Sequence, residues 1–130
     1  MKGMYPCGAR RPDTGEEPGT GGEAFDPEAA RRRMGVGRAA FGRLFECIWD
    51  EVTERRTLLD EAVWAGDLKQ VALHAHTIKS AAATIGAVAL SRAAAAVERA
   101  AGSGDRDGLA AGMDALHGAK ETLCKLVGMG

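Results

Sequence analysis

Apolar residues recur at spacings of three and four through most of the chain from residue 41 to residue 127, and this periodicity most limits the possible folds. Such spacing lines one face of a helix with apolar side chains, and no segment shows the strict alternation of a half-buried strand. Helix-ending glycines and capping aspartates interrupt the pattern at Gly66-Asp67, at Gly86 and at Gly102–Asp105. We therefore expect an all-α fold, an up-and-down antiparallel four-helix bundle.

The rest of the chain divides into an arm and a covering helix. Residues 1–24 are rich in proline and glycine, a composition that buries too little apolar surface to offset its ordering entropy, so we expect a disordered arm. A short helix should open at Asp26-Pro27, close at Gly35 and cover the bundle. Residues 25–130 then form one domain, with enough core to fold as a monomer.

Composition excludes several functional classes. A formal net charge of -1 gives no basic surplus to attract nucleic acid or an anionic membrane. No apolar run approaches the roughly 20 residues of a membrane span, and the first residues lack the apolar segment of a secretory signal. The cysteines Cys7, Cys47 and Cys124 are odd in number and lack metal-ligand spacing. We expect a cytoplasmic protein with no disulfide framework and no metal site.

The segment around His76 carries the most chemistry. At about 100° per residue, His76 lies one step from the apolar seam, so its ring should emerge at the flank of the bundle. Lys79, three residues on, falls on the same face and can bring its ammonium group to an anion attached to the imidazole. Small residues along this face would let a second protein approach the ring, and they are Ala72, Ser80, Ala83 and Gly86.

Helix register brings a carboxylate to the same place. If the chain reverses at Gly86-Ala87, positions whose numbers sum to about 174 lie level on the two antiparallel helices, so Glu98 is level with His76. Its carboxylate could accept the Nδ1 hydrogen and leave the Nε2 lone pair outward as a nucleophile. Alternatively, Glu98 is an ordinary exposed glutamate that pairs with Arg99 or Arg92.

The segment from Asp67 to Glu98 resembles a histidine-containing phosphotransfer domain of multistep two-component phosphorelays. The resemblance is carried by the string Ala75-His76-Thr77-Ile78-Lys79-Ser80, by Gly86 before the next helix, and by Leu90. Its helical texture extends over roughly residues 25 to 127, and the arm before it has no counterpart in the family. Serine at position 80 departs from the family's most frequent residue, glycine, but is still small enough for docking.

The resemblance implies a role for each residue of this segment. His76 would be the phosphoacceptor, Lys79 would support the phosphate, and Glu98 would orient the imidazole. The reaction would be reversible phosphoryl transfer with an aspartate of a response-regulator receiver domain, in a relay that also contains a hybrid sensor kinase. The chain has no nucleotide signature and no acidic cluster near His76, so it would be a phosphocarrier without a cofactor, and magnesium would come from the receiver.

Three other readings can be stated. A receiver-docking module without phosphotransfer would still bind its receiver domain after the substitution His76→Ala. The phosphoacceptor hairpin of a sensor kinase usually has an acidic residue directly after its histidine, where Thr77 stands here, and an ATP-binding domain. A metal site would need His74, His117 and Cys124 together, yet we expect both histidines to be surface or boundary residues.

We interpret Trp49, Trp64 and the phenylalanines as core or boundary anchors, and Arg31–Arg33 as a solvated face.

Overall fold

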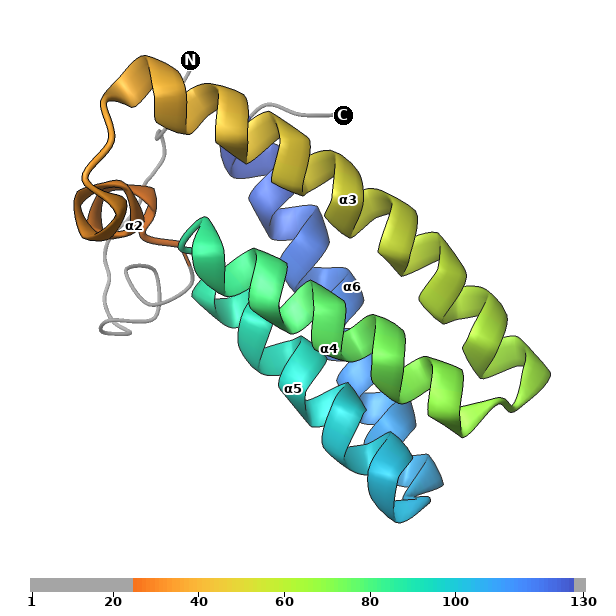
Figure 1. The fold of residues 1–130 in the computed structure, drawn as a ribbon. Coiled ribbons are helices and arrows are strands. Elements are labelled where there is room, and N and C mark those ends of the chain that lie inside the picture. The colour runs from red at the N-terminus through yellow and green to blue at the C-terminus, as the bar shows by residue number, and fades with distance from the viewer. Residues whose placement is uncertain (1–24, 128–130) are drawn as a thin grey trace, which may run out of the picture.

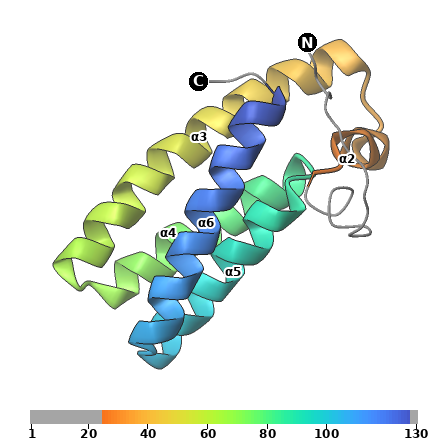
Figure 2. The same cartoon turned by 180° about the vertical axis from the view of Figure 1, so that it is seen from behind.

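A computed structural model describes residues 25–127, which form five helices and no strand (Figure 1). Their bounds are α2 (Pro27–Met34), α3 (Arg38–Ala65), α4 (Leu68–Thr84), α5 (Val88–Ser103) and α6 (Arg106–Val127). The four long helices run alternately up and down, and α2 lies at one end, so the expected all-α bundle is confirmed (Figures 1 and 2). The predicted disordered arm lies outside the described residues.

The core lies where the apolar seams of the four long helices meet. Alanines contribute much of it, and Ala75, Ala82 and Ala94 are fully buried, which allows helix axes to approach closely. The largest fully buried side chains come from all four long helices and from the α4–α5 turn, namely Val52, Leu59, Val71, Ile78, Ile85, Leu90, Val97 and Leu116. Helix α4 packs between α3 and α5, which fixes the face that it presents to solvent.

Local capping sets the helix boundaries that the sequence predicts. Gly66 adopts a left-handed conformation, with φ of 74°, at the end of α3. The side chain of Asp67 then accepts a hydrogen bond from the backbone of Gln70 at 3.3 Å, and that of Asp105 accepts one from Gly108 at 2.9 Å. These caps fix where α4 and α6 begin, whereas the turn at Gly86 sets the register of α4 against α5.

Gly86 joins the short helix α2 to the bundle. The backbone N–H of Asp26 donates to the carbonyl oxygen of Gly86 at 2.7 Å, and a Cβ at Gly86 would lie 2.6 Å from the carbonyl carbon of Asp26. Gly86 also has a φ of 80°, which favours glycine. Phe25 packs edge-on against Phe45 of α3, with 5.9 Å between ring centroids. The entry of α2 is therefore held between the α4–α5 turn and α3.

Two large apolar side chains differ from expectation at the opposite end of the bundle. Trp49 is buried as predicted, but the prediction that Trp64 is a core or boundary anchor is wrong, because its side chain is 92% exposed. Leu68, which continues the three- and four-residue apolar spacing of α4, is 37% exposed. Both flank the α3–α4 turn, at the end of the bundle opposite α2.

Candidate functional site

His76 lies in the middle of α4, on the side of that helix facing solvent. Its neighbour Ala75 is fully buried in the core, whereas the His76 side chain is 56% exposed. Seam positions on either side therefore fix the helix rotation, and the ring emerges at the flank as the period predicts. The imidazole is therefore partly covered by the bundle and partly exposed to solvent.

Glu98 of α5 bridges the two polar side chains of α4. One carboxylate oxygen lies 3.0 Å from Nδ1 of His76, and the other accepts a hydrogen bond from Nζ of Lys79 at 2.9 Å. The hairpin register predicts the first contact, whereas the ion pair with Lys79 was not predicted. The hydroxyl of Ser91 donates to the carbonyl oxygen of Lys79 at 2.9 Å, which further fixes α5 against this turn of α4.

This arrangement fixes the chemical state of the exposed ring nitrogen. A carboxylate can only accept, so with Glu98 ionised Nδ1 of His76 carries the proton. In the neutral ring Nε2 then has the free lone pair and is a nucleophile. The hydrogen bond from Lys79, with a smaller effect from His76, holds the pKa of Glu98 below its ordinary value of 4.5, against an opposing desolvation effect. Glu98 is therefore ionised at neutral pH.

The surface around His76 consists mostly of small side chains that project little from the helix. Ala72 is half-buried, whereas Ser80 and Ala83 are exposed. These three predicted docking residues share one face of α4 with His76. Leu73, which sequence reasoning did not single out, lies about 60° around the helix from His76 and is 52% exposed. Its place outside the apolar seam was the signal that could have found it.

Gly86 differs from its predicted place on this exposed face. It is buried, because the backbone of Asp26 and Pro27 passes directly over it. The correction has a plain physical reason: the missing side chain admits a segment of the same chain, at the start of α2. Gly86 thus holds the start of α2 and does not line the exposed face around His76.

The other two histidines do not join the site. His74 was expected at the surface or boundary, and this is corrected, since it is only 9% exposed and its Nδ1 lies 3.2 Å from a guanidinium nitrogen of Arg55. His117 is exposed, with its Nδ1 2.9 Å from Arg56. Within residues 25–127, no three histidine, cysteine or acidic side chains gather as metal ligands, so His74, His117 and Cys124 are not brought together.

The sequence was also compared with known proteins. The model of one protein family, described as Hpt domain, matches residues 43–125, which covers α4, α5 and most of α3 and α6. Neither the curated proteins nor the solved structures gave a significant match to the chain. Among the described residues, no helix combines the length and the apolar character needed to cross a membrane.

Proposed function

This chain belongs to the Hpt domain family, and we propose that it accepts and donates a phosphoryl group through Nε2 of His76, in exchange with receiver-domain aspartates. Hpt domains are phosphocarriers of phosphorelays and interact with response-regulator and kinase components. The observation that carries the proposal is the contact of Glu98 with Nδ1 of His76, because it directs the other ring nitrogen outward as a nucleophile.

The transfer step balances without a cofactor in this chain. The Nε2 lone pair attacks the phosphorus of an aspartyl phosphate, the phosphorus–oxygen bond to the carboxyl group breaks, and the aspartate leaves as a carboxylate. Nδ1 keeps its proton, so the ring gains positive charge as the nitrogen–phosphorus bond forms. The carboxylate of Glu98, 3.0 Å away, stabilises that charge. Transfer to a second receiver reverses these steps.

In the proposed transfer, Lys79 interacts first with Glu98 and then with the phosphoryl group. Its ammonium group is held by Glu98 on the His76 side of α4, and its side chain is 35% exposed. A phosphoryl group on Nε2 adds negative charge close by, so the ammonium group can contact the phosphate oxygens while Glu98 supports the ring. The magnesium ion and its carboxylate ligands would come from the receiver. The hybrid sensor kinase would supply phosphate to that receiver.

The opening around the ring supports close approach by a folded partner. In-line transfer requires the phosphorus of the receiver's aspartyl phosphate to come within about 3–3.5 Å of the attacking nitrogen. Ala72, Ser80 and Ala83 project too little to prevent this approach, and the apolar Leu73 adds a surface that a partner can cover. A docking module without phosphotransfer would use the same face.

Phosphate transfer from purified, phosphorylated receiver domains tests the proposal directly. We expect acid-labile, alkali-stable label on the wild-type chain, no label on His76→Gln, and label on His74→Gln, which removes a histidine two residues away on the same helix. A folded His76→Gln that still binds the receiver would show that the loss is chemical. Binding by the wild-type chain without label from any receiver would instead favour the docking module.

A further inference from the structure

Helix α2 lies outside the part of the chain that the Hpt family matches, yet it sits beside the candidate docking face. The segment 26–38 contains four arginines against Asp26 and Glu28, a formal net charge of +2 in a chain whose net charge is -1. Its start is fixed on Gly86, directly after α4. A basic element is therefore held at the end of the helix that carries His76.

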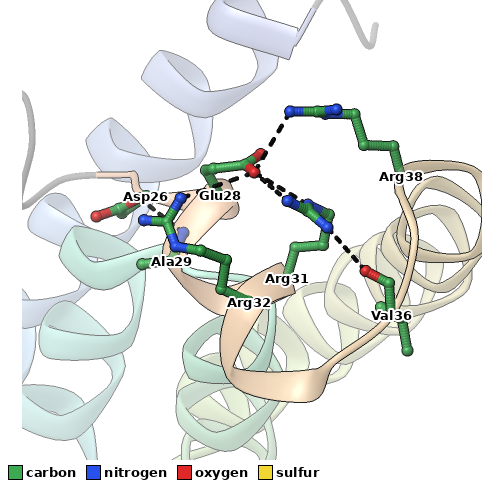
Figure 3. Close-up of polar contacts among 7 residues, drawn as sticks. All are labelled: Asp26, Glu28, Ala29, Arg31, Arg32, Val36 and Arg38. Atoms are coloured by element: carbon green, nitrogen blue, oxygen red, sulfur yellow. Dashed lines mark hydrogen bonds and ion pairs between the residues drawn. The ribbon is translucent and has the colours of Figure 1, made fainter.

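The arginines of this segment have different partners. Figure 3 shows Arg31, Arg32 and Arg38 gathered around the single carboxylate of Glu28. Arg31 makes the close contact and also donates to the carbonyl oxygen of Val36 at 2.9 Å. These contacts hold the pKa of Glu28 below its ordinary value, mainly through the hydrogen bond from Arg31. Glu28 thus offsets only part of the positive charge around it.

Arg33 turns away from this cluster and reaches α4. Its guanidinium group donates to the backbone carbonyl oxygen of Ala83 at 3.2 Å, and both residues are exposed. No carboxylate within the described residues forms an ion pair with Arg33. One neutral carbonyl occupies part of a guanidinium group that has five N–H donors, so hydrogen-bonding capacity and full charge remain for a partner.

Arg33 lies close enough to the His76 ring for a single protein–protein interface to extend over both. Ala83 follows His76 by seven residues, so it lies on the same face, about 10 Å along the helix axis. A standard interface covers about 800 Å² on each partner, equivalent to a disc of about 16 Å radius. A receiver centred on His76 would therefore extend over Ala83, where the guanidinium group of Arg33 is bound.

We propose that α2 extends the receiver-binding surface, with Arg33 contacting an acidic side chain on the receiver domain that exchanges phosphate with His76. This inference rests on the proposed function. The receiver holds an aspartate and magnesium-binding carboxylates opposite His76, and the proposal places a further acidic side chain about 10 Å away, opposite Arg33. Arginine is suited to this contact, since its planar group pairs with a carboxylate through two hydrogen bonds.

Charge reversal at two ends of the bundle tests the proposal. Arg33→Glu should lower the second-order rate of phosphate transfer from the receiver about tenfold at low salt, and less at high salt. Arg106→Glu is the matched control, because it makes the same charge change at the start of α6, separated from α2 by the length of α5, about 24 Å. Its transfer rate should stay within about twofold of wild type.

Two further measurements separate docking from folding and chemistry. Arg33→Gln removes the charge without reversing it, so it should slow transfer in the same direction by a smaller factor, with unchanged circular dichroism. Direct labelling of His76 by phosphoramidate, which needs no receiver, should be equal in all variants. Equal transfer rates for Arg33→Glu and Arg106→Glu would overturn the role of Arg33 while leaving the proposed function intact. Failure of the wild-type chain to exchange phosphate with any receiver would overturn both.

Discussion

His74 and His76 lie two residues apart on α4 and differ in almost every property that governs reactivity. His76 is more than half exposed and its Nδ1 faces a carboxylate, whereas His74 is buried and its Nδ1 faces the guanidinium group of Arg55. Arginine can only donate, so Nδ1 of His74 accepts and the proton lies on Nε2. The partner at Nδ1 therefore selects which histidine has a free Nε2 lone pair.

Removing the carboxylate partner should reduce this difference most strongly. Glu98→Ala takes away the acceptor for the Nδ1 hydrogen of His76, so the ring loses both its orientation and the stabilisation of its developing charge. We expect phosphate transfer to slow about ten- to hundredfold. This is the range typical when a metal-bound histidine loses the hydrogen-bond partner of its other ring nitrogen. Single-turnover transfer from a phosphorylated receiver measures it.

Glu98→Gln is the matched control for that experiment. The amide oxygen of Glu98→Gln can still accept from Nδ1 of His76, although it lacks the negative charge. This variant should therefore keep most of the transfer rate that Glu98→Ala loses. Equal rates for Glu98→Ala and the wild-type chain would contradict the idea that this contact prepares the ring. The nitrogen chemical shifts of His76 should move from the Nδ1–H form in wild type towards a mixture in Glu98→Ala.

The second effect is expected at Lys79. Lys79→Met keeps most of the length of the side chain and removes its charge, so it should slow transfer about tenfold through lost support of the phosphate. It also removes the main cause of the lowered pKa of Glu98, and that pKa should rise towards 4.5. A carboxyl titration by NMR measures the shift. An unchanged transfer rate in a variant with wild-type circular dichroism would remove Lys79 from the site.

The same pKa gives a pH dependence of stability with a definite sign. Because folding lowers the pKa of Glu98, its contribution to stability is fully present above the ordinary value of 4.5 and is lost as the pH falls through the folded-state pKa. The difference in unfolding free energy between wild type and Glu98→Gln should therefore shrink below that range. It should also be small, because an ion pair this exposed is screened by solvent.

The smallest effect on transfer is expected at His74. His74→Ala removes a buried hydrogen-bonded ring beside Arg55, which should lower the free energy of unfolding by about 1–3 kcal/mol in urea denaturation. Under conditions where the variant is folded, the transfer rate should match wild type. A loss of transfer in folded His74→Ala would show that the two histidines are functionally coupled.

Much of the fold and the centre of the site could be predicted because they depend on local rules. The helical period fixed which face of each helix is apolar, and the glycine and aspartate signals fixed the turns. Counting back from the turn at Gly86 then placed Glu98 level with His76. The same counting could not predict the ion pair between Lys79 and Glu98, because a long lysine side chain has several partners within reach.

The sequence by itself determined the five helices within residues 25–127, the exposed flank position of His76 and the register that brings Glu98 beside it. Only the tertiary structure decided that Gly86 is covered by α2, that Arg33 reaches Ala83, that His74 is buried and that Trp64 is exposed. The physical reason is range: helix periodicity and capping act over a few residues, whereas these four features depend on how separate elements pack or end in space.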